Sequence, residues 1–169
     1  MMLLWSACRY SGVAQSKDEP YCENKWFDKM VRQTVKGTVP TLDVSELKER
    51  YSEFQILDAR EKEEFNVSHL KNAAFLGYKK MNEEALQKLD KNKPVAIYCS
   101  IGYRSEKMTE KLQEMGFKNV FNIYGSIFEW VNRGYPVVDS SGKETNKIHG
   151  YSRTWGIWIK NDKAEVVYK

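Results

Sequence analysis

The stretch Val95–Ser105 reads VAIYCSIGYRS and contains the end of a strand, a loop and the start of a helix. Its first four residues are apolar and β-prone, and Gly102 interrupts the loop that follows. The next apolar residues recur at the spacing of a helix face, with a glycine where the helix should end: Met108, Leu112, Met115 and Gly116. The pattern therefore predicts a strand, a loop and a helix in direct succession, which is typical of an α/β fold.

Cys99 lies between the end of that strand and the start of that helix. The free N–H groups of a loop and of a first helical turn point toward such a position, and the helix dipole adds partial positive charge. Both effects, together with the charge of Arg104 on the same loop, favour the thiolate, which is the nucleophilic form of cysteine. A cysteine at the end of a strand can also be a small buried hydrophobic residue, so spacing alone leaves both roles open.

The composition is that of a globular protein of one domain. The chain has 169 residues, of which 41% are hydrophobic and 30% charged, and its formal net charge is +4. Lysine and arginine are scattered among the acidic residues, so no basic face for binding nucleic acid is expected. No apolar stretch is as long as a transmembrane helix.

Residues 1–36 are predicted to form an N-terminal extension. The apolar run Met1–Ala7 followed by Cys8 resembles the end of a secretory or lipoprotein-type signal, and contact with a membrane is expected only if Cys8 is lipidated. The run is short and has no basic segment before it, so cytoplasmic and exported locations both stay open. In an oxidising compartment Cys8 and Cys22 can pair, which leaves Cys99 free. A short amphipathic helix is indicated by Trp26, Phe27, Met30 and Val31.

Residues 37–139 alternate strands with helices. Strands are expected near residues 39–42, 54–58, 73–76, 95–99 and 120–124, and helices near residues 44–51, 61–65, 82–89, 105–115 and 126–131. Asp43 with Glu46, and Ser126 with Glu129, have the spacing of capping boxes, and Asn82 can cap the helix that follows it. This order predicts an α/β domain with a mainly parallel central sheet flanked by helices on both faces.

The last segment, residues 140–169, departs from this alternation. Ser140–Lys143 is predicted to be a linker. Residues 155–160 and 163–168 are predicted to form a C-terminal β-hairpin about an Asn161-Asp162 turn. The apolar face of that hairpin must be buried, either on the main domain or on a partner.

Three segments in this order resemble the signatures of the single-domain rhodanese family, and together they span residues 37–139. They are Ile56–Arg60 with Glu64-Phe65, Ser68–Leu70 and Asn72-Ala73; Cys99–Ser105; and Tyr124–Ser126 with Trp130, Gly134 and Pro136. Each is weak evidence alone, but their order and spacing together identify a rhodanese-like fold.

The resemblance implies a sulfurtransferase that moves sulfane sulfur from an anionic, thiosulfate-type donor to a thiol or cyanide acceptor. Cys99 would be the nucleophile and would carry the sulfur as a persulfide. The implied partners are the small donor and a thiol acceptor, which can be a protein, and no metal or organic cofactor is implied. The cradle for the persulfide would be the backbone N–H groups of Ser100, Ile101, Gly102, Tyr103, Arg104 and Ser105.

Other residues around these motifs are expected to support the loop. Asp58 and Arg60 match the family's Asp-x-Arg, for which an ion pair or loop brace is expected, and His69 matches a structural histidine at the start of a strand. Glu64 departs from the two-domain thiosulfate enzymes, which have an arginine there, and the acid puts strong thiosulfate affinity in doubt. Arg104 can attract the anionic donor or pair with a nearby carboxylate.

Two alternative functions remain. Phosphatases of the same fold separate cysteine from arginine by a loop one residue longer than the loop between Cys99 and Arg104, so the narrower loop disfavours phosphate. The other alternative is a sulfur-carrier or protein-binding module without turnover, whose partner docks on the C-terminal hairpin. The presence of Cys99 disfavours a module that takes up no sulfur.

Overall fold

The computed structural model describes residues 21–169. The predicted leader and Cys8 lie outside these residues, and so do the lipidation and disulfide expectations that depend on Cys8. Within residues 21–169, no helix combines the length and apolarity needed to cross a membrane.

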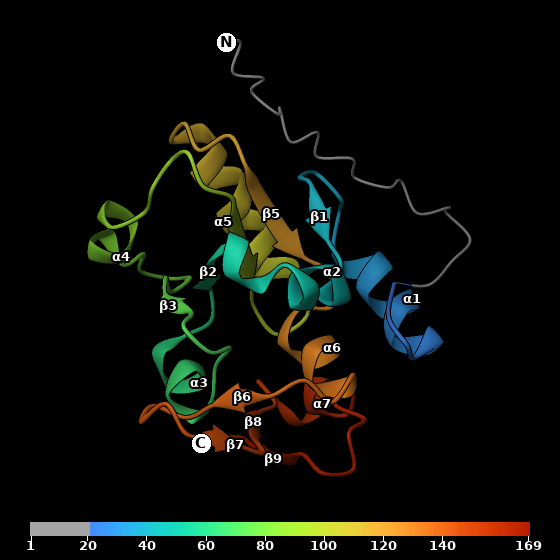
Figure 1. The fold of residues 1–169 in the computed structure, drawn as a ribbon. Helices are drawn as coiled ribbons and strands as arrows, with labels where there is room; N and C mark the ends of the chain where they lie inside the picture. The colour runs from blue at the N-terminus through green and yellow to red at the C-terminus, as the bar shows by residue number, and fades with distance from the viewer. Residues whose placement is uncertain (1–20) are drawn as a thin grey trace, which may run out of the picture.

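The centre of the fold is a parallel sheet of five strands in the order β1-β5-β4-β2-β3 (Figure 1). The strands are β1 (Thr41–Leu42), β2 (Gln55–Asp58), β3 (Ala74–Phe75), β4 (Val95–Tyr98) and β5 (Val120–Ile123). All residues of the central strand β4 are buried, as a near-continuous apolar run in a parallel sheet requires. The predicted mainly parallel sheet is therefore confirmed.

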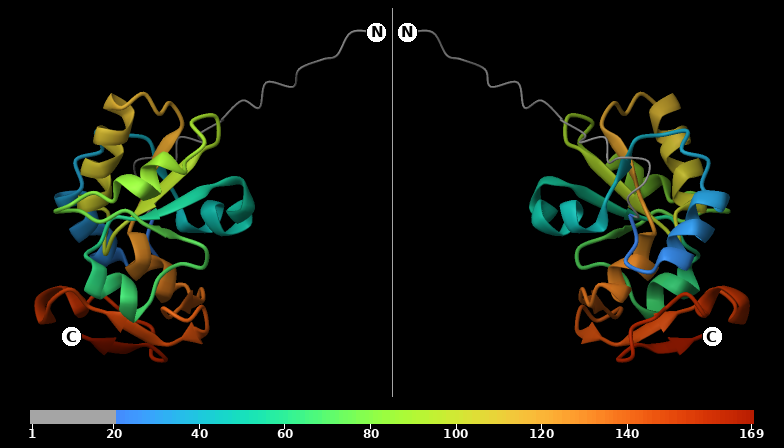
Figure 2. Two further views of the ribbon diagram at one scale, coloured as in Figure 1. Left: turned by 90° about the vertical axis from the view of Figure 1, so that its left-hand side faces the viewer. Right: turned by 90° about the vertical axis from the view of Figure 1, so that its right-hand side faces the viewer.

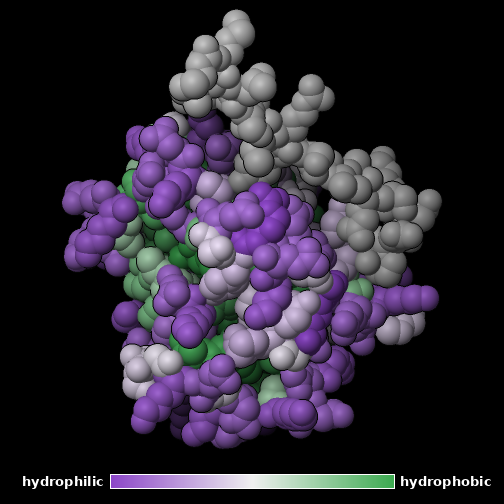
Figure 3. Space-filling model, viewed as in Figure 1, coloured by the Kyte–Doolittle hydropathy of each residue, from purple (hydrophilic) through white to green (hydrophobic). Residues whose placement is uncertain are grey.

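Helices cover both faces of this sheet. They are α1 (Lys25–Thr34), α2 (Val44–Glu49), a 3-10 turn (Tyr51–Glu53), α3 (Lys62–Val67), α4 (Glu83–Gln87), α5 (Tyr103–Glu114) and α6 (Ser126–Asn132). Successive side chains of β4 point to opposite faces. Ile97 therefore packs in a core with Met108 and residues of α4 and α5, whereas Tyr98 belongs to a second core built on α1, α2 and α6 with Phe128. On the face shown in Figure 3, hydrophobic residues appear mainly in recesses between hydrophilic ones.

The predicted N-cap residues of α2 and α4 are confirmed, whereas the predicted N-cap residue of α6 is wrong. The side chains of Asp43 and Asn82 accept hydrogen bonds from the first turns of α2 and α4. Asp43 is thus the N-cap, but the Glu46 carboxylate that was expected to complete a capping box pairs with Arg50 instead. At α6 the cap residue is Gly125 with φ 68°, and Ser126 itself has φ 52°. The turn out of β5 thus has two successive residues in the left-handed region, and it places Gly125 at the N-cap and Ser126 one position later, as the first residue of the helix. The predicted capping box of Ser126 with Glu129 is not formed.

The predicted C-terminal hairpin is also wrong. After the short antiparallel pair β6 (Val137–Val138) and β7 (Glu144–Thr145), strand β8 (Lys147–His149) pairs in parallel with β9 (Glu165–Val167). The residues expected in the first hairpin strand form the helical turn α7 (Arg153–Gly156) and a loop.

The physical reason for this difference lies in long-range packing. Trp158 stacks on Phe27 of α1 with ring centroids 5.9 Å apart, and Ile159 is buried in the second core. Gly150 lies against Tyr168, where an added Cβ would come within 2.7 Å of the tyrosine ring. The segment from β8 to the C-terminus therefore packs along one end of the main domain, below α3 and α6 in Figures 1 and 2.

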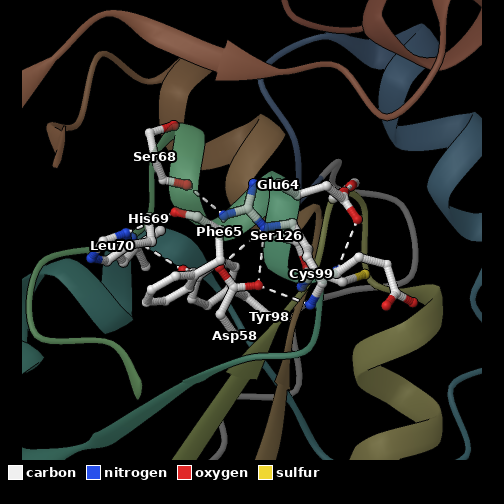
Figure 4. A network of polar contacts seen from close by, with 12 residues as sticks. Asp58, Glu64, Phe65, Ser68, His69, Leu70, Tyr98, Cys99 and Ser126 are labelled. Carbon is white, nitrogen blue, oxygen red and sulfur yellow. Dashed lines mark hydrogen bonds and ion pairs between the residues drawn. The ribbon is translucent and has the colours of Figure 1, made fainter. Parts of the chain in front are cut away.

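A buried ion pair ties together the ends of β2 and β4. The Asp58 carboxylate accepts hydrogen bonds from the backbone N–H, Nε and Nη2 of Arg60 and from the Tyr98 hydroxyl at 2.6 Å. Arg60 also donates from Nη2 to the Ser68 carbonyl at 2.6 Å, and the Tyr98 hydroxyl accepts from the Leu70 N–H (Figure 4). Asp58, Arg60 and Tyr98 are all fully buried. This brace fixes the loop after β2 against the strand that precedes Cys99.

Replacing Asp58 by alanine should lower the free energy of unfolding by about 3–5 kcal/mol, because the Arg60 guanidinium would stay buried without its counter-charge. Urea denaturation measures this change. Glu84→Gln is the control, since its ion pair with Lys88 is exposed and contributes about 0–1 kcal/mol. Equal losses in the two variants would show that the buried pair does not hold the fold together.

Candidate active site

Cys99 is held by its backbone at the start of α6. Its N–H donates to the Ser126 hydroxyl at 3.1 Å, and its carbonyl accepts from the Ile127 N–H at 3.2 Å. The Ser126 hydroxyl in turn donates to the Ile123 carbonyl at 2.9 Å. Through these two hydrogen bonds, the Ser126 hydroxyl connects Ile123, at the end of β5, to Cys99, which follows β4.

The loop after Cys99 turns back so that hydrogen-bond donors face the sulfur. The Gly102 N–H donates to Sγ at 3.2 Å, and the Ser105 Oγ lies 3.5 Å from Sγ. Gly102 has φ 120°, a conformation that only glycine adopts without strain, and an added Cβ would meet Val35 at 3.1 Å. The turn thus depends on glycine at this position.

Asn122 supports this loop, although the sequence analysis did not single it out. Its side chain is fully buried, and its Nδ2 donates to the Gly102 carbonyl at 3.1 Å. Its Oδ1 lies 2.7 Å from the Ser105 hydroxyl, whose single proton is shared between this oxygen and Cys99 Sγ. A polar residue inside the otherwise apolar run of β5 was the signal in the sequence. Buried amides are retained where they satisfy polar backbone groups, and here that group belongs to the loop.

Arg104 is paired with Glu64 of α3. Two parallel hydrogen bonds of 2.6 and 2.8 Å join the guanidinium to the carboxylate, and Arg104 also donates to the Ser100 hydroxyl at 2.9 Å. Both side chains are largely buried. Of the two roles considered for Arg104, pairing with a carboxylate is the one that the structure contains. The carboxylate neutralises much of the positive charge next to the cysteine.

The pKa of Cys99 is nevertheless lowered from the ordinary value of a thiol. Burial alone would raise this pKa, but the Arg104 charge, the Ser105 hydroxyl and the N–H groups of Ser105 and Gly102 together outweigh burial. Cys22 behaves in the opposite way, since burial and the charges of Glu129 and Asp28 raise its pKa. Of the two cysteines within residues 21–169, Cys99 is the one whose surroundings favour the thiolate.

A pocket of about 270 Å³ opens above Cys99, whose side chain is 1% exposed at its base. The pocket is lined by Thr34, Glu61, Tyr78, Lys79, Cys99, Ser100, Ile101, Tyr103, Arg104, Tyr151 and Trp155. Of the loop residues expected to surround the sulfur, Gly102 and Ser105 contact it directly and the others line the pocket. Tyr151 and Trp155 were not anticipated, because the segment that carries them was expected to be a hairpin.

The remaining predicted residues lie outside this pocket. Asp58 and Arg60 form the brace described above. The His69 ring stacks on Phe65 with centroids 3.9 Å apart, and its Nδ1 lies 3.0 Å from the Phe65 carbonyl (Figure 4). No cluster of three or more histidine, cysteine, aspartate or glutamate side chains suited to a metal ion occurs in the described part of the chain.

Comparisons with known proteins agree with this architecture. A family model described as "Rhodanese-like domain" matches residues 43–133. The thiosulfate sulfurtransferase GlpE of Coxiella burnetii is 36% identical over 75 residues, which cover 44% of this chain and 69% of that protein. The putative sulfur carrier protein YrkF of Bacillus subtilis is 25% identical over 100 residues, covering 57% and 54%. The crystal structure of a rhodanese-related protein from Thermoplasma volcanium superposes with a TM-score of 0.54 at 28% identity, covering 59% of this chain and 98% of that one.

The rate of Cys99 alkylation by iodoacetamide should follow a titration whose midpoint lies below that of an ordinary cysteine thiol, because the pKa of Cys99 is lowered. In Ser105→Ala the midpoint should move up, because the thiolate loses its share of the hydroxyl proton that lies between Sγ and Asn122 Oδ1. Mass spectrometry of the Cys99 peptide separates this reaction from that of Cys22. Ser141→Ala, on an exposed turn, is the control. An unchanged midpoint in Ser105→Ala would contradict a role of this hydroxyl in stabilising the thiolate.

Proposed function

The chain belongs to the rhodanese-like domain family, and from that premise we propose that it is a sulfurtransferase that carries sulfane sulfur on Cys99 as a persulfide. The observation that supports this most directly is the geometry at the sulfur. Sγ lies at the base of a pocket and faces the N–H of Gly102 and the hydroxyl of Ser105. This geometry supports Cys99 as the nucleophile, with the Gly102 N–H and the Ser105 hydroxyl as groups that stabilise its anion.

The reaction proceeds in two displacements. The Cys99 thiolate attacks the outer sulfur of a thiosulfate-type donor, a new S–S bond forms, and sulfite leaves with the electron pair of the broken S–S bond. A thiolate or cyanide acceptor then attacks the outer sulfur of the persulfide, and Cys99 leaves as the thiolate. The sulfur travels on the protein itself, so the two steps need no cofactor.

The loop residues have distinct proposed roles. Gly102 and Ser105 stabilise Cys99 as the attacking and as the leaving thiolate. The remaining loop amides, from Ser100 to Arg104, surround the outer sulfur of the persulfide, since consecutive N–H groups at a helix start favour an anion. Arg104 holds the loop through its bonds to Glu64 and Ser100. Because its charge is shared with Glu64, an inorganic dianion such as thiosulfate is bound weakly.

A sulfur-carrier module without turnover is the second candidate, and the similarity to a putative sulfur carrier favours it. Its partner could not dock on the hairpin once expected, because that hairpin does not form. A phosphatase is disfavoured, since the loop is short and Arg104 is engaged by a carboxylate. Sulfur loading that is not followed by discharge to a small acceptor would favour the carrier.

Incubation with thiosulfate should add one sulfur atom to the reduced wild-type chain, and cyanide should remove it. Cys99→Ser should gain none, because the persulfide needs the thiolate of this residue. Intact-protein mass spectrometry measures both results. Cys22→Ser is the matched control and should load like the wild type. Equal loading of Cys99→Ser would exclude Cys99 as the carrier.

Glu64→Gln should lower the KM for thiosulfate by roughly fivefold to tenfold, because the Arg104 charge would no longer be neutralised beside the pocket. Steady-state sulfur transfer to cyanide measures this change, and discharge of a preloaded persulfide should be unaffected. Glu63→Gln, an exposed neighbour on α3, is the control. If Glu64→Gln unfolds at the same urea concentration as the wild type and its KM for thiosulfate is unchanged, the donor does not approach Arg104.

A further inference from the structure

The C-terminal segment, residues 147–169, lies outside the part of the chain that the family model matches, yet it forms one wall of the pocket above Cys99. We propose that this segment belongs to the sulfur-transfer site. Its Tyr151 and Trp155 favour organic thiols as acceptors over small inorganic nucleophiles such as hydrosulfide. The inference rests on the proposed function and specifies the acceptor of its second step.

The wall above Cys99 presents aromatic rings. Tyr151 and Trp155 join Tyr78 and Tyr103 around the pocket. The ring of Tyr151 lies over the Arg104 guanidinium, with its centroid 5.0 Å from Cζ. The edge of the Arg104 guanidinium is therefore paired with the Glu64 carboxylate, and its face is covered by the Tyr151 ring. With this charge engaged, the pocket contacts an acceptor mainly through aromatic rings.

The wall is anchored to the main domain. Asn132, at the end of α6, donates to the Trp158 carbonyl at 3.0 Å and accepts from the Lys160 N–H at 2.6 Å. Asn161 donates to the Val131 carbonyl at 2.7 Å. These bonds attach the loop that follows α7 to α6 at three residues. The position of α7, which contains Trp155, is thereby fixed relative to the main domain.

Tyr151 combines a strained backbone with an exposed side chain. It has φ 61°, a conformation that costs free energy for a residue other than glycine, and its N–H donates to Nδ1 of His149 at 3.1 Å. Tyr151 is 52% exposed, and Tyr103, the first residue of α5, is 41% exposed. Large aromatic side chains left exposed beside a recess are typical of a surface that a ligand covers.

The size of the pocket favours a small organic molecule. Its volume of about 270 Å³ is close to the lower end of small-molecule sites, about 300 Å³. A compact ion would leave most of the rings in contact with water, whereas a carbon-bearing thiol would bury them. Cys99 is 1% exposed at the base of the recess, so an acceptor must enter the pocket to reach the persulfide.

In this step the acceptor thiolate attacks the outer sulfur of the Cys99 persulfide. A new S–S bond forms on the acceptor, the bond to Cys99 breaks, and its electron pair stays on Cys99 as the thiolate. The proton of the acceptor thiol is released to solvent before the attack. Contact of the organic body with Tyr151 and Trp155 orients the acceptor and speeds discharge.

The test measures discharge of the preloaded persulfide by hydrosulfide, a compact nucleophile, and by 2-phenylethanethiol, an organic one. Trp155→Ala and Tyr151→Ala should each slow discharge by the organic thiol about tenfold, the effect of losing one aromatic contact, and change discharge by hydrosulfide less than about twofold. Trp155→Phe should restore most of the rate. Trp26→Ala, an exposed tryptophan on α1 away from the pocket, should change neither rate. Equal effects on both nucleophiles, or no effect on either, would overturn the inference.

A second measurement separates this inference from the proposed function. If the mass of the wild-type chain shows no persulfide after treatment with donors, the proposed function fails. The wall is then tested by alkylation of Cys99 with iodoacetamide and with N-benzyl iodoacetamide. The benzyl reagent should be favoured in the wild type, and this preference should be lost in Trp155→Ala. An unchanged preference would overturn the selective role of the wall.

Discussion

A thiolate that is almost wholly removed from water must be stabilised by the protein around it, and this constraint governs the arrangement near Cys99. The side chain is 1% exposed, and burial alone would favour the neutral thiol. The charge of Arg104, the Ser105 hydroxyl and the N–H groups of Ser105 and Gly102 outweigh this effect, so that the pKa of Cys99 is lowered. Each of these groups is held by other elements: Ser105 by Asn122 of β5, and Arg104 by Glu64 of α3.

The same low-dielectric surroundings explain why the nearby charges occur in pairs. Asp58 with Arg60, and Glu64 with Arg104, are joined by multiple hydrogen bonds, because a single buried charge would be too costly. The first pair fixes the ends of β2 and β4, and the second connects α3 to the loop. Neutralisation by Glu64 has a consequence for chemistry, since it reduces the attraction of Arg104 for an anionic donor while leaving it close enough to favour the thiolate.

The segment after β7 extends this site beyond the parallel sheet. It lies at one end of the main domain (Figure 2). It places Tyr151 against Arg104 and Trp155 at the pocket. The cradle around the sulfur thus comes from the core of the rhodanese-like domain, whereas the wall of the pocket comes from outside the matched residues 43–133. In the proposed sulfur transfer, the chemistry and the selectivity would therefore be carried by different parts of one chain.

The sequence by itself determined the order of strands and helices, the position of Cys99 between β4 and α5, and the capping of α2 and α4. These features follow from local periodicity and from residues within one helical turn. The tertiary structure alone decided that Glu64 pairs with Arg104, that Asn122 holds the loop, that Gly125 and not Ser126 is the N-cap of α6, and that residues 153–156 form a helical turn instead of a strand. Each of these depends on contacts between residues far apart in the chain, whose free energies outweigh local preference and leave no periodic signal in the sequence.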